Sequence, residues 1–334
     1  MGLTAGPVAA PGSVLAVDAG NTKTDVALVA PDGSVLATGR AGGFQPSRTG
    51  VPAAVDVLGE ALASAGLRPG RGGPYADRVS ACLANADFPA EERELAEEIR
   101  RRGWGRETAV YNDTFALLRA GLPTGAAPRG VAVVCGAGIN CVGMTPDGRT
   151  ARFPAIGRIS GDWGGGGGLA EEALWWAARA EDGRGEPTEL ARALPAHLGQ
   201  DSMAALVEAF HFGRIPAARR HELAPVLFAV AAAGDPVALS LVHRQADEVV
   251  AMAAVALDRL GLLAEEVPVV LGGGVLAAGH PQLDGRIAER LAARAPRARI
   301  RVVTAPPVLG AALLGLDAVG APAGAHENAR ARFE

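Results

Sequence analysis

The sequence predicts an α/β protein built from two related halves, each with a mixed sheet. Apolar runs of strand length alternate with segments whose apolar residues have helical spacing, as in α/β layers. A unit of strand, turn, strand, Pro-Asp-Gly turn and strand begins at Val14 and recurs from Val131. Antiparallel hairpin strands followed by βαβ connections predict a mixed sheet.

Each expected element follows from its local pattern. In the first half we expect strands at Val14–Asp18, Asp25–Ala30, Ser34–Thr38, Arg78–Leu83 and Thr108–Tyr111, and helices at Pro52–Ala65, Pro89–Arg102 and Thr114–Ala120. In the second half we expect strands at Val131–Cys135, Ile139–Thr145, Thr150–Phe153, Val267–Leu271 and Ile300–Thr304. Its helices are expected at Leu169–Ala180, Met203–Phe210, Ala224–Ala233, Pro236–Leu260, Pro281–Ala295 and from about Val308.

Composition excludes several classes of protein. Of 334 residues, 49% are hydrophobic and 20% are charged, which suits a chain with a sizeable core. A net charge of -4 opposes a general nucleic-acid or membrane-surface role, because both need a basic surface. The apolar runs are far shorter than the ~20 residues that span a bilayer, and no signal peptide is evident. Because three cysteines show no Cys-x-x-Cys spacing, we expect a cytoplasmic protein without a disulfide scaffold or a cysteine metal site.

The polar turn between the first two strands is a candidate phosphate-binding loop. Its backbone N–H groups and hydroxyls can point at one anion, and it contains the only lysine of the chain. Asp18, at the end of the first strand, can hold Mg²⁺ through water. The alternative is an ordinary hairpin turn. The candidate residues are Gly20, Asn21, Thr22 and Lys23.

The corresponding turn of the second half, Gly136, Ala137 and Gly138, is a second candidate for binding phosphates. The turn does not match a dinucleotide-binding motif, because Cys141 takes its sixth position and a strand follows. Two such turns can hold a polyphosphate from both sides.

Three further loops carry candidate residues. Asp113 follows Asn112 at the end of a strand, where a general base can lie, although Asp113 can equally be the N-cap of the next helix. Asp162 precedes a run of five glycines, which suits either backbone that approaches a ligand closely and moves, or a flexible linker. The last candidate is a glycine turn after a strand that suits contact with an adenine: Gly272, Gly273 and Gly274.

In this order, the loops resemble a known superfamily. Asp18-x-Gly20-x-Thr22-Lys23-Thr24, Asn112-Asp113, Gly136-x-Gly138-x-Asn140-Cys141, Gly161-Asp162 and Gly272-Gly273-Gly274 are similar to motifs of the sugar kinase/actin/heat-shock ATPase superfamily. Within it, the chain resembles the N-acetylglucosamine kinase branch of the BadF/BadG/BcrA/BcrD ATPases from about Val14 to Gly315. The resemblance implies two ribonuclease-H-like domains, residues 1–120 and 121–334. Each would be a mixed five-stranded sheet flanked by helices, with a cleft between them and the last helix packed back on the first domain.

The resemblance also implies roles for the residues. Both turns would hold the phosphates of ATP with Asp18 near Mg²⁺, the adenosine would lie on Gly272–Gly274, and Asp113 would be the catalytic base. The sugar-binding residues would be Gln45, Asn85, Asp87, Asn112, Asp113, Asn140, Cys141 and Asp162. Two positions depart from the family: Gln45 stands where Asn is frequent, and Trp163 follows Gly-Asp where an acidic residue is usual.

The implied activity is Mg-ATP-dependent phosphorylation of an amino sugar, N-acetylglucosamine at O6. We expect no nucleic-acid or membrane partner and a homodimer, although the apolar helices after Ala224 serve equally as core or as a dimer face. The alternatives are a kinase for another hexose or amino sugar, such as glucosamine or N-acetylmannosamine, an activator ATPase with a bridging iron–sulfur cluster, or a sugar sensor. Cys135 and Cys141 do not match the activator's spacing, and the presence of both Asp18 and Asp113 opposes a sensor.

Overall fold

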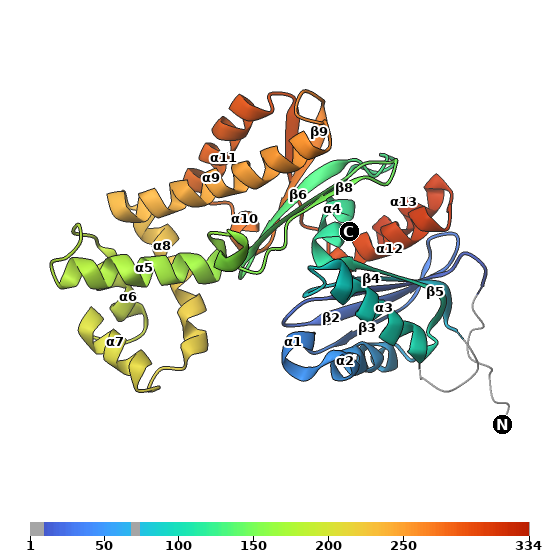
Figure 1. Cartoon of the computed structure of the whole chain (residues 1–334), viewed down its shortest axis with the longest axis horizontal. Helices are drawn as coiled ribbons and strands as arrows, with labels where there is room; N and C mark the ends of the chain where they lie inside the picture. Colours follow the sequence, from blue (N-terminus) through green and yellow to red (C-terminus); the bar gives the residue numbers. More distant parts are fainter. Residues whose placement is uncertain (1–9, 68–73, 334) are drawn as a thin grey trace. The chain divides into compact units, whose positions relative to one another are not determined.

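A computed structural model describes residues 10–67 and 74–333, which form an α/β protein with two five-stranded sheets (Figure 1). The strands are β1 (Val14–Ala19), β2 (Thr24–Val29), β3 (Val35–Ala41), β4 (Ala76–Leu83), β5 (Gly105–Asn112), β6 (Gly130–Cys135), β7 (Ile139–Met144), β8 (Thr150–Arg152), β9 (Val267–Gly272) and β10 (Ala298–Val302).

The described residues also contain these α-helices: α1 (Pro46–Thr49), α2 (Val51–Ser64), α3 (Pro89–Arg102), α4 (Asp113–Gly121), α5 (Gly165–Glu181), α6 (Leu190–His197), α7 (Met203–His211), α8 (Leu223–Ala232), α9 (Pro236–Arg259), α10 (Gly274–Ala277), α11 (Pro281–Arg294), α12 (Pro307–Ala318) and α13 (Ala323–Phe333). Two short 3₁₀ helices are η1 (Arg158–Ser160) and η2 (Ala217–Glu222). The α/β class expected from the sequence is confirmed.

The first sheet has the strand order β3-β2-β1-β4-β5. The strands β1, β2 and β3 are antiparallel neighbours, whereas β4 runs parallel to both β1 and β5. The sheet is therefore mixed, as the three hairpin strands followed by βαβ connections predict. Because β1, β4 and β5 are parallel, their carboxyl ends lie at one edge of the sheet.

Both faces of the first sheet are covered, and β1 shows why. Leu15 and Val17 belong to the core under α2 and α3, while Val14 and Ala16 belong to the core under α4, α12 and α13 (Figure 1). Successive residues of a strand point to opposite faces, so a strand buried on both sides has an unbroken apolar run, as β1 has from Val14 to Val17.

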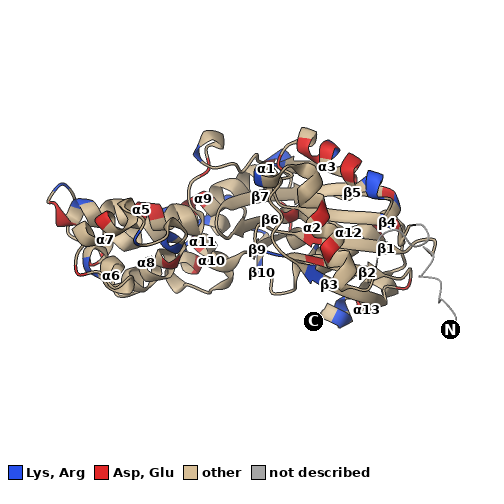
Figure 2. Ribbon diagram, turned by 90° about the horizontal axis from the view of Figure 1, so that it is seen from below, with Lys and Arg blue, Asp and Glu red and all other residues tan. Residues whose placement is uncertain are grey.

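The helix α3 has acidic residues in its first turn and arginines in its last turn, an order of charges that suits the helix dipole (Figure 2).

The helix α12 packs unusually closely against α4. A Cβ atom added at Gly310 would lie 1.7 Å from the carbonyl oxygen of Ala116, so only glycine fits there. Arg119 of α4 also donates to Asp317 of α12 through two hydrogen bonds, of 2.6 Å and 3.0 Å. The C-terminal segment is therefore part of the first sheet's core.

The second sheet has the order β10-β9-β6-β7-β8 and is also mixed, because β7 and β8 are antiparallel while β9 and β10 are parallel. The helix α9 packs against α8 and α11, and α5 packs against α6 and α8. Among the described residues, no single helix is long and apolar enough to cross a membrane. The segments Ala217–Ala232 and Pro236–Arg259, which are bent by 112° relative to each other, have the length and apolar composition of a membrane span only when they are taken together.

The described chain divides into two compact units. The first contains the residues up to Ala132, then Val142–Pro154 and the residues from Val303 on, and the second contains Val133–Cys141 and Ala155–Val302.

The sequence prediction was wrong at the glycine run. Gly165–Gly168 form the first turn of α5, which was expected to begin at Leu169. The short helices α1, α6 and α10 and the helix α13 were not anticipated, and Gln45 proves to be the N-cap of α1.

Two glycine-to-alanine changes test the packing of α12. We expect Gly310→Ala to lower the free energy of unfolding by about 1–3 kcal/mol, since the added methyl collides with the backbone of α4. Gly285→Ala is the matched control, because Gly285 is exposed within α11 and an added Cβ meets nothing within 4 Å. It should raise the stability by about 0.5–1 kcal/mol. Urea unfolding measures both, and an equal effect of the two changes would contradict this packing.

Candidate functional site

Polar side chains gather where the parallel strands of the first sheet end. Asp18 lies near the end of β1, Asn85 and Asp87 follow β4, and Asn112 and Asp113 stand where β5 gives way to α4. Carboxyl ends of parallel strands form the edge at which α/β proteins bind ligands. The topology therefore brings together residues that the sequence predicts to act on one site.

Hydrogen bonds connect the first turn to the expected sugar-binding loops. Asn85 Nδ2 donates to Asn21 Oδ1 at 3.1 Å, and Gln45 Nε2 donates to the Asn21 carbonyl oxygen at 2.9 Å. A Cβ at Gly43 would lie 2.1 Å from the same carbonyl oxygen, so glycine allows this close approach. Asn85 adopts the left-handed region with φ 60°, which Asn tolerates better than most residues. Asn21 thus joins the candidate phosphate turn to Gln45 and Asn85.

A second network fixes the loop around Asp113. The N-cap of α4 is Asn112, whose Oδ1 accepts from Thr114 N at 3.0 Å, so the alternative in which Asp113 caps the helix is wrong. Asn112 Nδ2 donates to Asp87 Oδ1 at 2.8 Å. Asp113 is the first residue of α4 and is half-buried.

The two aspartates at this edge have perturbed pKa values. Burial, followed by repulsion from Asp113, raises the pKa of Asp18 to about 8, although Lys23 opposes the shift. Burial raises the pKa of Asp113 to about 6, against hydrogen bonds from Thr114. Perturbed carboxylates of this kind are frequent at functional sites.

Asp18, which is buried, and Asp113, which is half-buried, repel each other when both are ionised. Such a pair fits a divalent cation with oxygen ligands, which would lower both pKa values. Mg²⁺ uses few protein carboxylates and keeps several waters. In the parts of the chain that the structure describes, no group of three or more His, Cys, Asp or Glu side chains could hold a metal by itself.

Hydrogen bonds hold the exposed Lys23 in the first turn. Asn21, Thr22 and Lys23 are exposed, and Gly20 N donates to Lys23 O at 2.9 Å. Lys23 Nζ donates to Asp25 Oδ2 at 2.9 Å, and Arg40 Nε donates to Asp25 Oδ1 at 2.6 Å. Burial raises the pKa of Asp25, but the bonds from Arg40 and Lys23 outweigh it and hold the pKa below its ordinary value. Sequence reasoning missed Asp25, and its only signal was its place two residues after the lone lysine.

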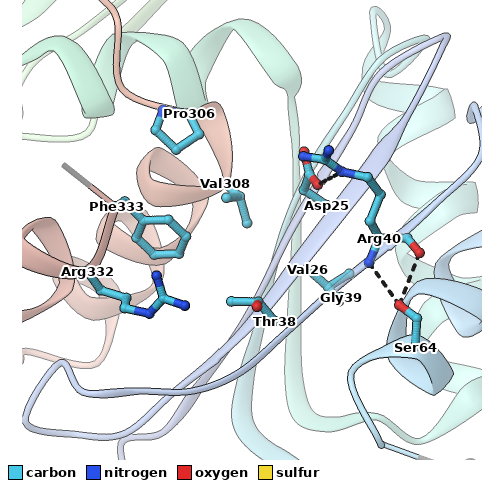
Figure 3. Close-up of a pocket in the computed structure, with 10 residues that line it drawn as sticks. All are labelled: Asp25, Val26, Thr38, Gly39, Arg40, Ser64, Pro306, Val308, Arg332 and Phe333. Atoms are coloured by element: carbon cyan, nitrogen blue, oxygen red, sulfur yellow. Dashed lines mark hydrogen bonds and ion pairs between the residues drawn. The ribbon is translucent and has the colours of Figure 1, made fainter.

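Asp25 and Arg40 also line a cavity of about 540 Å³ beside β2, β3 and α13. Figure 3 shows Arg40 turned toward Asp25, with Thr38, Val308 and Phe333 across the cavity. None of the residues that line this cavity is a predicted site residue.

Glycines of the second unit converge on the second turn. Gly166 N donates to Gly136 O at 2.7 Å and Gly167 N donates to Ala137 O at 2.9 Å, so the turn accepts from the first turn of α5. A Cβ at Gly165 would lie 2.5 Å from Gly138 Cα. The glycine run is therefore a packed helix start rather than a mobile loop.

The expected adenosine loop also approaches this turn. Gly273 has φ 85°, and a Cβ there would lie 2.5 Å from the carbonyl oxygen of Cys135. Gly273 is the N-cap of α10, which begins at Gly274, and Gly272 ends β9. The two candidate loops are thus neighbours in the second unit.

Asp162 lines a cavity of about 270 Å³ together with Ala137 and Gly138 of the second turn. One carboxylate oxygen, Oδ2, accepts from Gly157 N at 3.0 Å and from Ser160 Oγ at 2.5 Å. Gln245, which sequence reasoning missed and no motif marks, accepts from Gly165 N at 2.9 Å. The structure thus places Asp162 beside the second turn.

The remaining predicted residues of this unit lie in β7. Asn140 Oδ1 accepts from Cys141 N at 2.7 Å, and Cys141 is fully buried. Burial raises the pKa of the Cys141 thiol well above its ordinary value. Contact of either residue with a sugar stays a prediction.

Two mixed five-stranded sheets flanked by helices are the architecture of the actin-like sugar kinases, which solved structures similar to this chain represent. The chain belongs to the BadF/BadG/BcrA/BcrD ATPase family, whose sequence model matches residues 15–315. The family expected from the motifs is thereby confirmed.

Three similar proteins carry related names. An N-acetylmuramic acid/N-acetylglucosamine kinase of Clostridium acetobutylicum is 26% identical over 266 residues, or 79% of this chain and 85% of the relative. An N-acetyl-D-glucosamine kinase of Dictyostelium discoideum is 24% identical over 328 residues, or 91% and 97%. The crystal structure of a candidate N-acetylglucosamine kinase from Chromobacterium violaceum matches with a TM-score of 0.66 and 26% identity, covering 91% of this chain and 98% of that one.

The buried charge of Asp18 leads to a prediction about stability. Its pKa is about 8 in the folded state and 3.8 ordinarily, so the folded state binds the proton more tightly. The stability from this group is fully present below the ordinary pKa and is lost as the pH rises through the folded pKa. Asp18→Asn removes the charge, so without nucleotide or divalent cation it should raise the free energy of unfolding at pH 8 by about 1–2 kcal/mol.

Urea unfolding at about pH 5 and pH 8 measures this effect, which should be larger at the higher pH. The exposed Asp201 provides the control Asp201→Asn, which should change little at either pH. An Asp18→Asn effect that is the same at both pH values would contradict the assigned burial of charge.

Proposed function

We propose that this protein is an ATP-dependent sugar kinase that phosphorylates N-acetylglucosamine at O6. The observation that carries the proposal is Asp113, a half-buried carboxylate at the carboxyl end of a parallel strand, held beside the Asn112–Asp87 pair. A general base with a pKa near 6 is ionised at neutral pH and still accepts a proton readily. The names of the relatives support N-acetylglucosamine as the acceptor.

Each group of residues has a place in the reaction. Mg-ATP supplies a phosphoryl group whose transfer depends on positioning and on stabilising charge. Asp113 accepts the proton of the sugar hydroxyl, while Asp18 holds the cation through water. Gly20–Lys23 and Gly136–Gly138 bind phosphates, and Gly272–Gly274 bind the adenosine.

The sugar contacts are proposed for the polar side chains that surround Asp113 and for the residues near the second turn. These are Gln45, Asn85, Asp87, Asn112, Asn140, Cys141 and Asp162. The same proposal includes Mg²⁺, a homodimer and a cytoplasmic location, which the family resemblance and the composition support. Kinases for glucosamine or N-acetylmannosamine are the nearest alternatives.

An assay of ADP release across a panel of hexoses and amino sugars tests the proposal. We expect release to depend on the sugar and to be fastest with N-acetylglucosamine. Product analysis should find the phosphate on O6. Equal slow release with every sugar and with none would contradict a kinase function.

Asp113→Asn tests the base in the same assay. The change should lower kcat about 10²–10⁴-fold, the usual contribution of a general base, with the affinity for ATP nearly retained. Asp201→Asn serves again as the control. Unchanged turnover would remove Asp113 from the reaction.

The single lysine allows a direct test of the first turn. Because Lys23 is the only lysine and its side chain is 48% exposed, an amine-acylating reagent should modify one lysine, read by peptide mass spectrometry. We expect Mg-ATP to slow this modification several-fold by covering the ammonium group, as phosphate binding by lysine requires. AMP, which lacks the outer phosphates, is the matched control. Equal protection by AMP and ATP would place Lys23 away from those phosphates.

A further inference from the structure

The cavity of about 540 Å³ beside β2, β3 and α13 lies outside the residues that the proposed reaction uses. All of its lining residues belong to the first compact unit. Arg332 and Phe333 of α13 lie across the cavity from Arg40 of β3 (Figure 3). Its lining includes three side chains that can donate hydrogen bonds and three apolar ones: Thr38, Arg40, Arg332, Pro306, Val308 and Phe333.

The backbone of Arg40 is held against α2. Arg40 N donates to Ser64 Oγ at 2.8 Å, and a Cβ at Gly39 would lie 2.2 Å from the carbonyl oxygen of Ala61. In the described part of the chain, the Arg40 side chain donates only through Nε, to Asp25 Oδ1 at 2.6 Å. Because a guanidinium has five N–H groups, both Nη atoms of Arg40 remain available to a ligand.

The helix α13 is docked on its neighbours, which fixes the place of Arg332. Arg330, two residues earlier, is buried and donates to the carbonyl oxygens of Ala120 at 3.0 Å and Leu122 at 2.7 Å. Arg332 itself is exposed, and its side chain forms no hydrogen bond or ion pair with any residue that the structure describes. Its guanidinium is therefore a second donor group at the cavity.

Positive charge exceeds negative charge around this cavity. Asp25 is the only acid among the described lining residues, and it already accepts from both Lys23 and Arg40. Arg332 adds a third cation. Guanidinium groups bind phosphate through paired N–H bonds, and the space is far larger than a bare phosphate ion needs. The apolar walls leave room for an organic group attached to the phosphate.

We propose that this cavity binds a phosphate monoester and that its occupancy weakens the binding of ATP at the first turn. The phosphate accepts from Arg332, from Thr38 and from the Nη atoms of Arg40. The organic group of the ester lies against Val308 and Phe333.

Asp25 connects the cavity to the first turn. Its Oδ2 accepts from Lys23 and its Oδ1 from Arg40, so the two cations share one carboxylate. A phosphate on Arg40 takes part of the attraction between Arg40 and Asp25, and Asp25 then attracts Lys23 more strongly. Lys23 is thus less available to the outer phosphates of ATP. This effect on ATP rests on the proposed function, because it takes Lys23 as a phosphate ligand, whereas the site itself does not.

Calorimetry without nucleotide tests the site, with phenyl phosphate as the probe because its ring suits the apolar walls. Arg332→Gln should weaken its binding about 10–100-fold, as the loss of a hydrogen bond between charged groups does. Arg332→Lys should retain part of the affinity, because lysine keeps the charge but not the bidentate geometry. Arg93→Gln, at an exposed arginine of α3 in the same unit, is the matched control and should change nothing.

Inorganic phosphate distinguishes a free ion from an ester as the ligand. It should bind at least about 10-fold more weakly than phenyl phosphate, since it leaves the apolar walls in contact with water. Equal affinity for the two probes would overturn the assignment to a monoester. Equal binding of phenyl phosphate by the wild type and by Arg332→Gln would overturn the site.

The affinity for Mg-ATP tests the connection through Asp25. Saturating phenyl phosphate should weaken the binding of Mg-ATP about 5-fold or more in the wild type, and Mg-ATP should weaken phenyl phosphate by the same factor. Arg332→Gln should bind Mg-ATP normally and lose this effect at the same ester concentration. Arg40→Gln should weaken Mg-ATP binding without any ester, because Asp25 then holds Lys23 alone.

The results separate the inference from the proposed function. If phenyl phosphate binds but leaves the affinity for Mg-ATP unchanged, or lowers it equally in Arg332→Gln, the connection through Asp25 is wrong. If Mg-ATP does not bind at all, the proposed function fails, and the calorimetry without nucleotide still decides whether the cavity is a phosphate site.

Discussion

The placement of two carboxylates, one buried and one half-buried, where parallel strands end is the constraint on which the candidate site depends. Asp18 and Asp113 raise each other's energy when both are ionised, and burial adds to that cost. Lys23 offsets part of this cost at Asp18, and hydrogen bonds from Thr114 offset part of it at Asp113. The neighbouring amides fix the surrounding loops, because Asn112 caps α4 and donates to Asp87, and Asn85 donates to Asn21. The edge of the first sheet is thus arranged around charge that the protein itself compensates only in part, as sites that bind a cation and phosphates require.

In the second unit, close contacts between backbone segments hold the candidate loops in place. Gly165 and Gly273 each stand where a side chain would collide with the backbone of the second turn or of the strand before it. The N–H groups at the start of α5 bond to the second turn, so they hold that turn in place instead of facing an anion. The turn is therefore fixed from two sides, and Asp162 lies beside it in one cavity.

The sequence predicted the fold class, the order of most elements and the family. The fold class and the elements could be predicted because alternating apolar runs and repeated Pro-Asp-Gly turns are local signals, and the family could be predicted from the order of the five loop motifs. The glycine run was misread, since glycine disfavours helices and only the contact of Gly165 with Gly138 explains why a helix begins there. Asp25 and Gln245 carry no motif, because each holds a partner elsewhere in the chain, at Lys23 and Gly165. The roles of the predicted site residues remain predictions for the experiments to decide.

The packing of α12 has a consequence for the order in which the chain can fold during synthesis. The first sheet is made early, yet one of its two faces is covered by Leu309, Leu313 and Leu316, which are translated only after all strands of the second sheet. A nascent chain released up to β10 therefore exposes Val14, Ala16 and Val29 to water, and such apolar strand surface favours aggregation. Chaperone dependence in the cell, and aggregation of chains truncated before α12, are the expected biological marks of this architecture.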